Sequence, residues 1–380
     1  MTIIDSGAAH PALKPLHAAG LDLRNRLAVA PMTRVSAAPD GTPTRQMAEY
    51  YAAFARGGFG LVITEGTYTD DRYSQGYFNQ PGIVTDGHVA AWREVTERVH
   101  AAGAVTVQQL MHAGALSQGN PHRPETIGPS AVAPLREMMP EYGGSGPWPV
   151  PREMTADDID EVVAGFAAAA GNSLRAGFDG VEVHAANGYL LDQFITDYTN
   201  RRTDGYGGAP ADRLRLTAEV VAAIRTVLGP DAVIGVRLSQ GKVNDFTYRW
   251  PGGARDAELI FGALAEAGAS YLHVASEGRA WVESATLDGG ATITALAREV
   301  TGLPVIANGG MHDPAQAAEV LEDGHADLLS IGHGALANPD LPRRLESGAA
   351  LAEFDRRLLE PMATLDNAEH RRRERTGAAS

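Results

Sequence analysis

Short runs of apolar and β-branched residues recur along the chain, separated by longer segments in which apolar residues repeat with helical spacing. We predict these eight runs as strands: Leu27–Met32, Leu61–Glu65, Val105–Leu110, Gly180–His184, Val233–Leu238, Tyr271–Val274, Pro304–Asn308 and Asp327–Ile331. Eight strands alternating with eight helices predict an α/β fold, a single (β/α)8 TIM barrel with long loops at its carboxyl face. A doubly wound open sheet is the alternative, but "APMTRVSA" after the first run lacks the glycine-rich turn typical of that fold.

Several helical segments carry boundary signals. Thr155 followed by Asp158 predicts an N-terminal cap, and Gly177 predicts the end of the same helix. Asp313 can cap a later helix whose first position is Pro314. The predicted apolar faces are Ile159, Val163, Phe166, Ala170 and Leu174 in one helix; Leu214, Val221, Ile224 and Leu228, closed by Gly229, in the next; and Ala315, Ala318 and Leu321 in the later one.

Three connections are too long for simple turns: Ala113–Met154, Ser239–Gly253 and Ser276–Gly289. The first is rich in proline and glycine, which predicts an ordered, lid-like excursion over the barrel mouth. We expect residues 1–350 to form the cofactor-binding barrel and residues 351–380 to form a C-terminal helix and a solvated tail.

Composition and charge narrow the class of protein. The 380 residues are 44% hydrophobic, enough for a large core, and the net charge of −15 argues against a nucleic-acid surface. The sequence has no apolar run of membrane-spanning length, and its start, "MTIIDSGAAH", lacks the features of a signal peptide, so we expect a cytoplasmic enzyme with no membrane partner. Cysteine is absent, which excludes disulfides, thiolate nucleophiles and cysteine-held clusters.

Polar side chains follow every predicted strand. In barrels of this type the chemistry gathers where strands end, on the loops of the carboxyl face. The strand ends carry, in chain order, Pro31, Met32, Thr33 and Arg34; Thr64, Glu65 and Gly66; Gln109 and His112; His184, Asn187 and Tyr189; Arg237; His273; "NGG" at Asn308–Gly310; and "GHG" at Gly332–Gly334. A barrel without an active site has no need of these groups, so we predict an active site at this mouth.

The glycines after the last two strands indicate a phosphate site. Glycines let backbone N–H groups converge on an anion, and this region of a TIM barrel commonly holds phosphate. Arg237 supplies a permanent cation, and Gln109 can offer a donor and an acceptor to the edge of a heterocycle. Together these features favour a phosphorylated planar cofactor and suggest flavin mononucleotide (FMN).

Several motifs resemble the Old Yellow Enzyme family of flavin-dependent ene-reductases. They are "APMTR", "ITEG", "QLMHAG", "HAANGYLLDQF", "RRTDGYGG", "VRLS", "ANGG" and "GALANPDLP", and the resemblance runs from about Leu13 to Leu345. It implies a barrel that holds FMN, takes a hydride from NADPH or NADH, and passes it to the β-carbon of a small activated alkene, an α,β-unsaturated carbonyl or a nitroalkene. Residue roles carry over with it. The resemblance assigns the flavin ring to Pro31, Met32, Thr33, Gly66, Gln109 and Arg237; the phosphate to Asn308, Gly309, Gly310, Gly332 and His333; and the substrate to His184, Asn187 and the proton donor Tyr189.

The chain departs from the family pattern at two positions. His333 stands where relatives often have Arg or Lys, and Ala115 where an arginine is common. We expect these two changes to affect the strength of the phosphate and flavin contacts but not the identity of the cofactor. The absence of cysteine excludes the larger family branch that carries an iron–sulfur cluster. A homo-oligomer is left open.

Three rival interpretations remain at this point. A metal-dependent hydrolase or lyase would use His112, His184 and His273 as ligands, although Arg237 would oppose the cation. A Schiff-base aldolase would need Lys14 or Lys242, and neither lies within a predicted strand. A flavin-binding sensor without turnover would have no need of Tyr189 or of the His184 and Asn187 pair.

Overall fold

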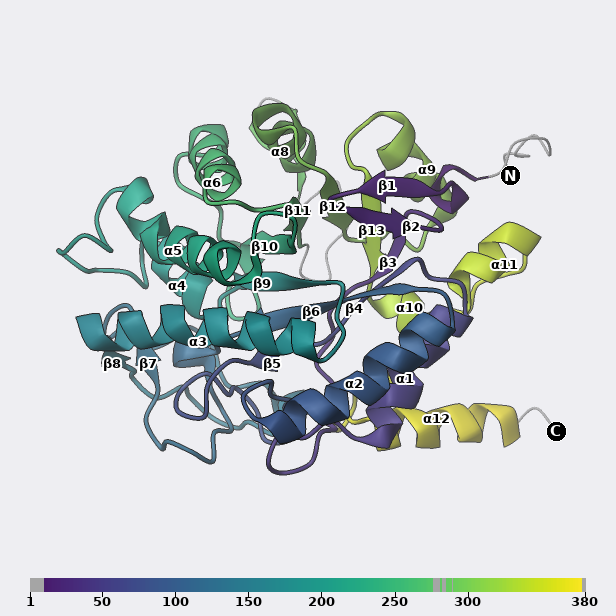
Figure 1. The fold of residues 1–380 in the computed structure, drawn as a ribbon, viewed down its shortest axis with the longest axis horizontal. Coiled ribbons are helices and arrows are strands. Elements are labelled where there is room, and N and C mark those ends of the chain that lie inside the picture. Colours follow the sequence, from purple (N-terminus) through teal and green to yellow (C-terminus); the bar gives the residue numbers. More distant parts are fainter. Residues whose placement is uncertain (1–9, 276–280, 282–284, 289, 378–380) are drawn as a thin grey trace.

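Eight parallel strands close into a barrel in a computed structural model that describes residues 10–275, 281, 285–288 and 290–377 (Figure 1). The barrel strands are β3 (Leu27–Val29), β4 (Leu61–Ile63), β6 (Val105–Met111), β9 (Gly180–Asn187), β10 (Val233–Lys242), β11 (Tyr271–Val274), β12 (Val305–Asn308) and β13 (Leu328–Ile331). They pair in the order β4-β3-β13-β12-β11-β10-β9-β6, and the β4–β6 pairing closes the barrel. The predicted TIM barrel is therefore confirmed.

Helices cover the outside of the barrel (Figure 1). The helices are α1 (Arg45–Arg56), α2 (Asp86–Ala101), α3 (Ala156–Arg175), α4 (Leu190–Ile195), α5 (Pro210–Leu228), α6 (Ala254–Glu266), α8 (Ile293–Thr301), α9 (Pro314–Glu322), α10 (His333–Ala337), α11 (Leu341–Ser347) and α12 (Leu365–Gly377). The capping box of Thr155 and Asp158 is present, and Asp313 caps α9 with Pro314 at its first position, as predicted.

Two predicted helix faces need correction. In α3, Leu174 lies at the edge of the buried face and is 38% exposed, whereas Val162 and Ala169 are buried. In α9 the buried residues are Ala317 and Val320, whereas Ala315 is exposed and Leu321 packs only partly buried against the core, so the buried face is rotated from the predicted one. Alanine is found on both the buried and the exposed faces of helices. A short alanine-rich segment therefore does not indicate which face of the helix packs against the barrel.

A hairpin of β1 (Leu16–Ala18) and β2 (Leu21–Leu23) covers the amino end of the barrel. Its turn residues Ala19 and Gly20 both have positive φ, 54° and 82°, which matches the two-residue turn that antiparallel strands favour. The hairpin packs on the apolar interior at that end, in a cluster with Ala28, Leu61 and Val107. The hairpin therefore fills the amino end of the barrel, which leaves the carboxyl end for a functional site.

The long connection after β6 is ordered. It contains the short strands β7 (Ile127–Gly128) and β8 (Arg152–Glu153), which pair in parallel, and two 3-10 turns. The connection after β10 is shorter than predicted because β10 continues to Lys242. The predicted connection Ser276–Gly289 lies largely outside the described residues.

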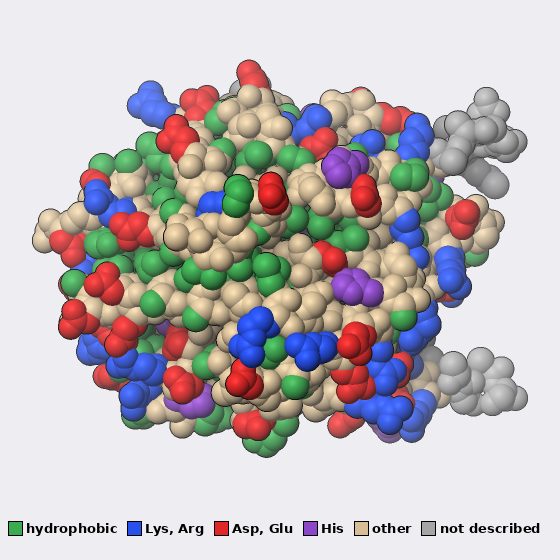
Figure 2. Space-filling view, in the orientation of Figure 1, with side chains coloured by type: hydrophobic (Ala, Val, Ile, Leu, Met, Phe, Trp, Pro, Cys, Tyr) green, Lys and Arg blue, Asp and Glu red, His purple; other side chains and the backbone are tan. Residues whose placement is uncertain are grey.

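The C-terminal segment returns to the start of the chain. Helix α12 lies beside α1 (Figure 1), where Gln46 Nε2 donates to Asp366 Oδ1 at 2.8 Å. Leu365 N donates to Ser36 Oγ at 2.9 Å. In Figure 2 basic side chains gather with acidic ones over this corner, and ion pairs such as Arg371–Glu374 and Arg373–Glu369 intersperse the two signs. Within the described part of the chain, no helix combines the length and apolar character needed to cross a membrane.

Candidate active site

A cavity of about 610 Å³ opens at the carboxyl ends of the barrel strands. Its size falls within the range of ligand pockets in proteins. All fourteen residues predicted for the cofactor and substrate line it: Pro31, Met32, Thr33, Gly66, Gln109, His184, Asn187, Tyr189, Arg237, Asn308, Gly309, Gly310, Gly332 and His333. Residues from seven of the eight barrel strands or their following loops thus meet in one cavity, with His273 of β11 deeper in the barrel.

The turn after β9 positions two of the substrate residues. Asn187 has φ 66°, in the left-handed region that asparagine tolerates better than most residues, and Gly188 follows with φ 87°. Three hydrogen bonds hold this conformation. Asn187 N donates to Ser239 Oγ at 2.8 Å, Val243 N donates to Asn187 O at 3.2 Å, and Gly188 N donates to Asp192 Oδ2 at 2.7 Å. The "NGY" motif is therefore a constrained turn that directs Asn187 and Tyr189 to the cavity.

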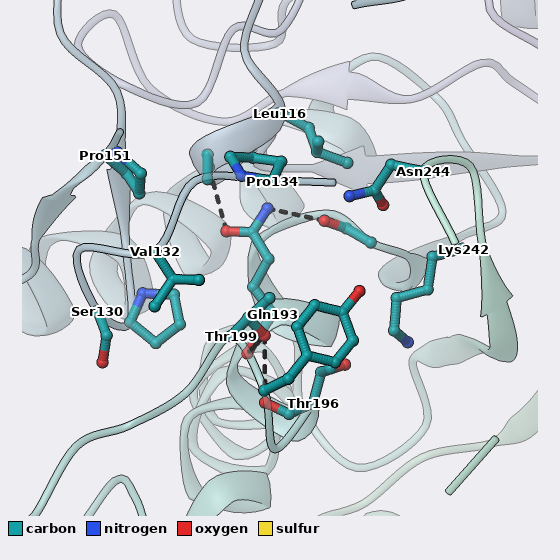
Figure 3. Close-up of a pocket in the computed structure, with 14 residues that line it drawn as sticks. Leu116, Ser130, Val132, Pro134, Pro151, Gln193, Thr196, Thr199, Lys242 and Asn244 are labelled. Atoms are coloured by element: carbon teal, nitrogen blue, oxygen red, sulfur yellow. Dashed lines mark hydrogen bonds between the residues drawn. The ribbon is translucent and has the colours of Figure 1, made fainter. Parts of the chain in front are cut away.

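Helix α4 supports the same turn from behind. Gln193 Nε2 donates to Gly188 O at 2.7 Å, while Gln193 Oε1 accepts from Ala115 N at 3.1 Å (Figure 3). Beside it, Lys242 Nζ donates to both carboxylate oxygens of Asp192 at 2.8 Å. The small hollow that Figure 3 draws around these residues measures about 10 Å³, room for roughly one water molecule. It is a packing feature behind the turn and is too small for a substrate.

His184, Asn187 and Tyr189 form a polar group at one side of the cavity. Burial, with the charge of Arg237, lowers the pKa of His184 to about 3, so its imidazole is neutral near pH 7. Among the described residues, His184 Nδ1 and Asn187 Oδ1 are buried and have no hydrogen-bond partner. Buried polar atoms without partners are uncommon, so these two indicate a place where a polar ligand atom binds.

Tyr189 is held between two rings. Its ring meets the His184 ring edge-on, with centroids 5.0 Å apart. Its hydroxyl is hydrogen-bonded to the hydroxyl of Tyr77, which is buried and whose pKa lies well above the ordinary value because of burial and of Tyr189 itself. The Tyr142 ring packs against Tyr77 with centroids 4.8 Å apart. The Tyr189 phenol is therefore fixed at the cavity wall in a defined orientation.

Another part of the cavity fits a planar heterocycle. Gln109 and Arg237 line it from β6 and β10, and Met32 and Met111 line it as well. A Cβ at Gly66 would lie 2.4 Å from Met111 Sδ and 3.2 Å from Met111 Cβ, so the glycine lets the Met111 side chain pack directly against the chain at this point. A carboxamide and a guanidinium beside apolar side chains match the polar rim and apolar faces of a flavin ring.

The glycine-rich end of the cavity fits a phosphate. Gly309 and Gly310 have φ 118° and 66°, conformations that glycine adopts without strain and that leave their amide groups clear of side chains. The His333 ring stacks on the Phe354 ring with centroids 4.1 Å apart and planes within 8°. His312 and Arg356 line the same end of the cavity. Burial, with the charges of His312 and Arg356, lowers the pKa of His333, so Arg356 is the permanent cation at this end.

Some lining residues could not be found from strand patterns. They are Met139, Glu141 and Tyr142 of the loop after β6; Val243 and Phe246 of the loop after β10; His312; and Phe354, Arg356, Leu359 and Glu360 of the C-terminal segment. His312 directly follows "NGGM", so its position after the seventh strand was the one available signal. The loop residues have no periodicity that would mark them.

The rival chemistries find little support in the geometry. The described residues contain no group of three or more His, Asp or Glu side chains that could hold a metal ion. His273 is hydrogen-bonded on both sides, to Glu182 at 2.9 Å and to Ser330 at 2.7 Å. Lys242 is paired with Asp192, and Lys14 is exposed, so neither lysine lies in the cavity as a free amine.

Comparisons with known proteins agree with this geometry. The model of the NADH:flavin oxidoreductase / NADH oxidase family matches residues 12–352. The chain is 37% identical to putative 12-oxophytodienoate reductase 5 of Oryza sativa subsp. japonica, over 92% of this chain and 91% of that protein. It is 35% identical to a probable flavin mononucleotide-dependent alkene reductase of Leishmania infantum, over 90% and 92% of the two chains.

The structural comparison leads to the same family. The Old Yellow Enzyme homologue of Zymomonas mobilis superimposes with a TM-score of 0.84 at 32% identity, covering 94% of this chain and 98% of that one. The match thus extends over nearly the whole chain. The chain therefore belongs to the NADH:flavin oxidoreductase / NADH oxidase family, the Old Yellow Enzymes, and is an NAD(P)H-dependent flavin oxidoreductase whose cofactor is FMN.

Proposed function

We propose that this protein is an ene-reductase that reduces the C=C bond of small α,β-unsaturated carbonyl compounds and nitroalkenes. The observation that carries the proposal is the group of His184, Asn187 and Tyr189 in the same cavity as the cofactor residues. A flavoprotein that only stores or senses FMN has no need of two unpartnered polar side chains and a fixed phenol at that place. The similarity to the probable flavin mononucleotide-dependent alkene reductase of Leishmania infantum supports an alkene as the substrate.

The cofactor residues divide between the two ends of the cavity. Pro31, Met32, Thr33 and Gly66 would line the flavin ring, with Gln109 at the pyrimidine edge and Arg237 at its N1–O2 side. Asn308–Gly310, Gly332 and His333 would hold the phosphate. FMN bound there would supply the chemistry of hydride transfer from NADPH or NADH to the β-carbon of the alkene.

The substrate residues would stabilise the charge that develops. A ring N–H of His184 and the amide NH2 of Asn187 would donate hydrogen bonds to the carbonyl or nitro oxygen, where negative charge builds as the β-carbon accepts the hydride. One such pre-placed donor is worth ~10²–10³ in rate. The neutral state of the His184 imidazole leaves it one N–H for this purpose and keeps that N–H available over the working pH range.

Tyr189 would complete the reaction by giving its hydroxyl proton to the α-carbon. A phenol is protonated near pH 7, and the hydrogen bond with Tyr77 holds the Tyr189 oxygen in place while its proton is transferred. The hydride at one carbon and the proton at the other account for both hydrogens that the saturated product gains. Water then returns the proton to Tyr189.

An anaerobic spectrophotometric titration tests the proposed function. The FMN-loaded protein should lose its yellow colour when NADPH or NADH is added and regain it when a simple cyclic enone follows, with the saturated ketone as product. Bleaching without reoxidation by any enone or nitroalkene would show a flavin reductase of another kind. Protein that holds no FMN would contradict the assignment of the cavity.

A further inference from the structure

A buried carboxylate, Glu182, lies one layer below the cofactor cavity. Glu182 and His184 are two residues apart on β9, so their side chains point to the same side of the strand, and His184 lines the cavity while Glu182 lies deeper. Glu182 has no solvent exposure. A buried charge needs several polar partners to be stable, so the groups around Glu182 indicate what it does.

Three donors meet this carboxylate, one from the adjacent strand β6 and two from β11, which lies beyond β10. Gln109 Nε2 donates to one oxygen at 2.8 Å, and the Tyr271 hydroxyl donates to the other at 3.0 Å. His273 Nδ1 lies 2.9 Å from the same second oxygen. A Cβ at Gly235 would lie 2.0 Å from Tyr271 Cζ, so the glycine makes room for the Tyr271 ring in this cluster.

The carboxylate determines which end of the Gln109 amide faces the cofactor. An ionised carboxylate only accepts hydrogen bonds, so Gln109 must direct its NH2 group to Glu182. The amide oxygen and the second N–H then remain for a group in the cavity, which Gln109 lines. This is the pair of atoms that can serve an N–H and a carbonyl side by side on a pyrimidine ring. Without Glu182, either end of the amide could face that ring.

The protonation states of Glu182 and His273 in this cluster are also defined. Burial opposes ionisation of Glu182, but the interaction with His273, the charge of Arg237 and the hydrogen bond from Gln109 outweigh it and hold the pKa of Glu182 below its ordinary value. Burial lowers the pKa of His273, so His273 is neutral, with Nδ1–H toward Glu182 and Nε2 accepting from Ser330 at 2.7 Å. The cluster therefore carries one negative charge on Glu182, close to the positive charge of Arg237.

We propose that Glu182 is a positioning residue for the cofactor: it fixes the Gln109 carboxamide against the pyrimidine edge, and its charge offsets that of Arg237, so that it lowers the reduction potential of bound FMN. The proposal rests on the placement of the flavin ring at Gln109 and Arg237 given above. Reduction brings negative charge to this end of the ring, so a nearby anion opposes reduction and a nearby cation favours it.

The test compares two variants of the FMN-loaded protein that each alter the same buried cluster. Glu182→Gln removes the charge and frees the Gln109 amide to turn. Tyr271→Phe removes one hydrogen bond to Glu182 but keeps the carboxylate and its contact with Gln109. For each variant, the midpoint potential is measured by anaerobic titration against a reference dye, the FMN dissociation constant by flavin fluorescence, and stability by chemical denaturation.

We expect Glu182→Gln to shift the reduction equilibrium of bound FMN by about tenfold toward the reduced form. For a two-electron couple this corresponds to a midpoint potential that is ~30 mV more positive. The FMN affinity of this variant should fall by ~10-fold, the worth of one hydrogen bond, because the Gln109 amide no longer faces the ring in a fixed orientation. Tyr271→Phe should keep the parent potential and affinity while losing comparable stability. An unchanged potential in folded, FMN-bound Glu182→Gln, or equal shifts in both variants, would overturn the proposal.

A second variant covers the case in which Glu182→Gln does not fold. Glu182→Asp keeps the negative charge, but its shorter side chain places the carboxylate farther from Gln109. The FMN affinity of this variant should therefore fall several-fold, whereas Tyr271→Phe should retain the parent affinity. Equal affinities in these two variants would overturn the role of Glu182. A parent protein that holds no FMN would instead overturn the cofactor placement, so the two failures are distinguishable.

Discussion

Lys242 Nζ lies 2.8 Å from both carboxylate oxygens of Asp192, and the two side chains are only 2% and 1% exposed. Asp192 also accepts the backbone N–H of Gly188, in the turn that carries Asn187 and Tyr189. Burial raises the pKa of Asp192, and the charge of Lys242 opposes that effect, so each member of the pair depends on the other. The pair thereby joins the end of β10 to α4 and to the turn after β9.

We predict that Lys242→Met destabilises the folded protein by ~3–5 kcal/mol, because it leaves a buried carboxylate without its cation. The double variant Lys242→Met with Asp192→Asn should regain most of that loss, since asparagine is neutral and can still accept from Gly188 N. Denaturant unfolding of the FMN-loaded proteins measures both values. A double variant as unstable as the single one would contradict the account of the pair.

Arg237→Met should weaken FMN binding by up to ~10²-fold and slow reduction of the flavin by NADPH or NADH. The negative charge on the reduced ring would lose its cation in a cavity that excludes much of the water. Arg237→Lys, which keeps the charge but not the planar guanidinium, should lie between the parent and Arg237→Met. Full FMN occupancy with parent reduction rates in Arg237→Met would remove Arg237 from this role.

His184→Ala combined with Asn187→Ala should lower the rate with enones by ~10²-fold or more, because the developing charge on the substrate oxygen loses its donors. Reduction by the nicotinamide should slow as well if both reactants use these side chains. The FMN content should stay near that of the parent, since neither residue is assigned to hold the cofactor. A double variant isolated without flavin would show that the two residues belong to the cofactor site.

The buried state of His184 predicts a pH dependence of stability. Its folded pKa of about 3 lies below its ordinary value of 6.5, so between these values the unfolded chain binds a proton that the folded chain does not. Stability must then fall as pH decreases below 6.5, by up to ~1.4 kcal/mol per pH unit from this one group. His184→Asn should lose less stability than the parent between pH 6.5 and pH 4. Identical slopes in the two proteins would contradict a neutral, buried His184.

The sequence predicted most of the barrel and of its mouth, for a physical reason. Buried parallel strands are short apolar runs, and a polar residue such as Gln109, Arg237 or Asn308 at the end of such a run is conspicuous against them. The orientation of α9 could not be predicted, because Ala315 and Ala317 have the same hydrophobicity and only the tertiary packing distinguishes them.

The pattern of apolar and polar residues could not predict the long-range contacts that complete the site. Tyr77 meets Tyr189 from a loop after β4, and Arg356 reaches the glycine-rich end from the C-terminal segment, far along the chain from the strands. In the sequence, Glu182 looks like an ordinary polar residue of a strand with alternating polarity. The three donors that distinguish it are visible only in the structure. Such residues depend on contacts distant in sequence, which periodicity does not encode.

The most direct test of the proposed reaction is stopped-flow measurement of both half-reactions in Tyr189→Phe. The change keeps the ring and removes only the hydroxyl that meets Tyr77. Flavin reduction by NADPH or NADH should proceed almost as in the parent, because that step takes no proton from Tyr189. Reoxidation by a simple enone should slow by up to ~10²–10⁴, the usual worth of a positioned acid, and nitroalkenes should suffer less because their anions can be protonated later by water. Equal slowing of both half-reactions, or an unchanged rate with enones, would contradict the assignment of Tyr189 as the proton donor.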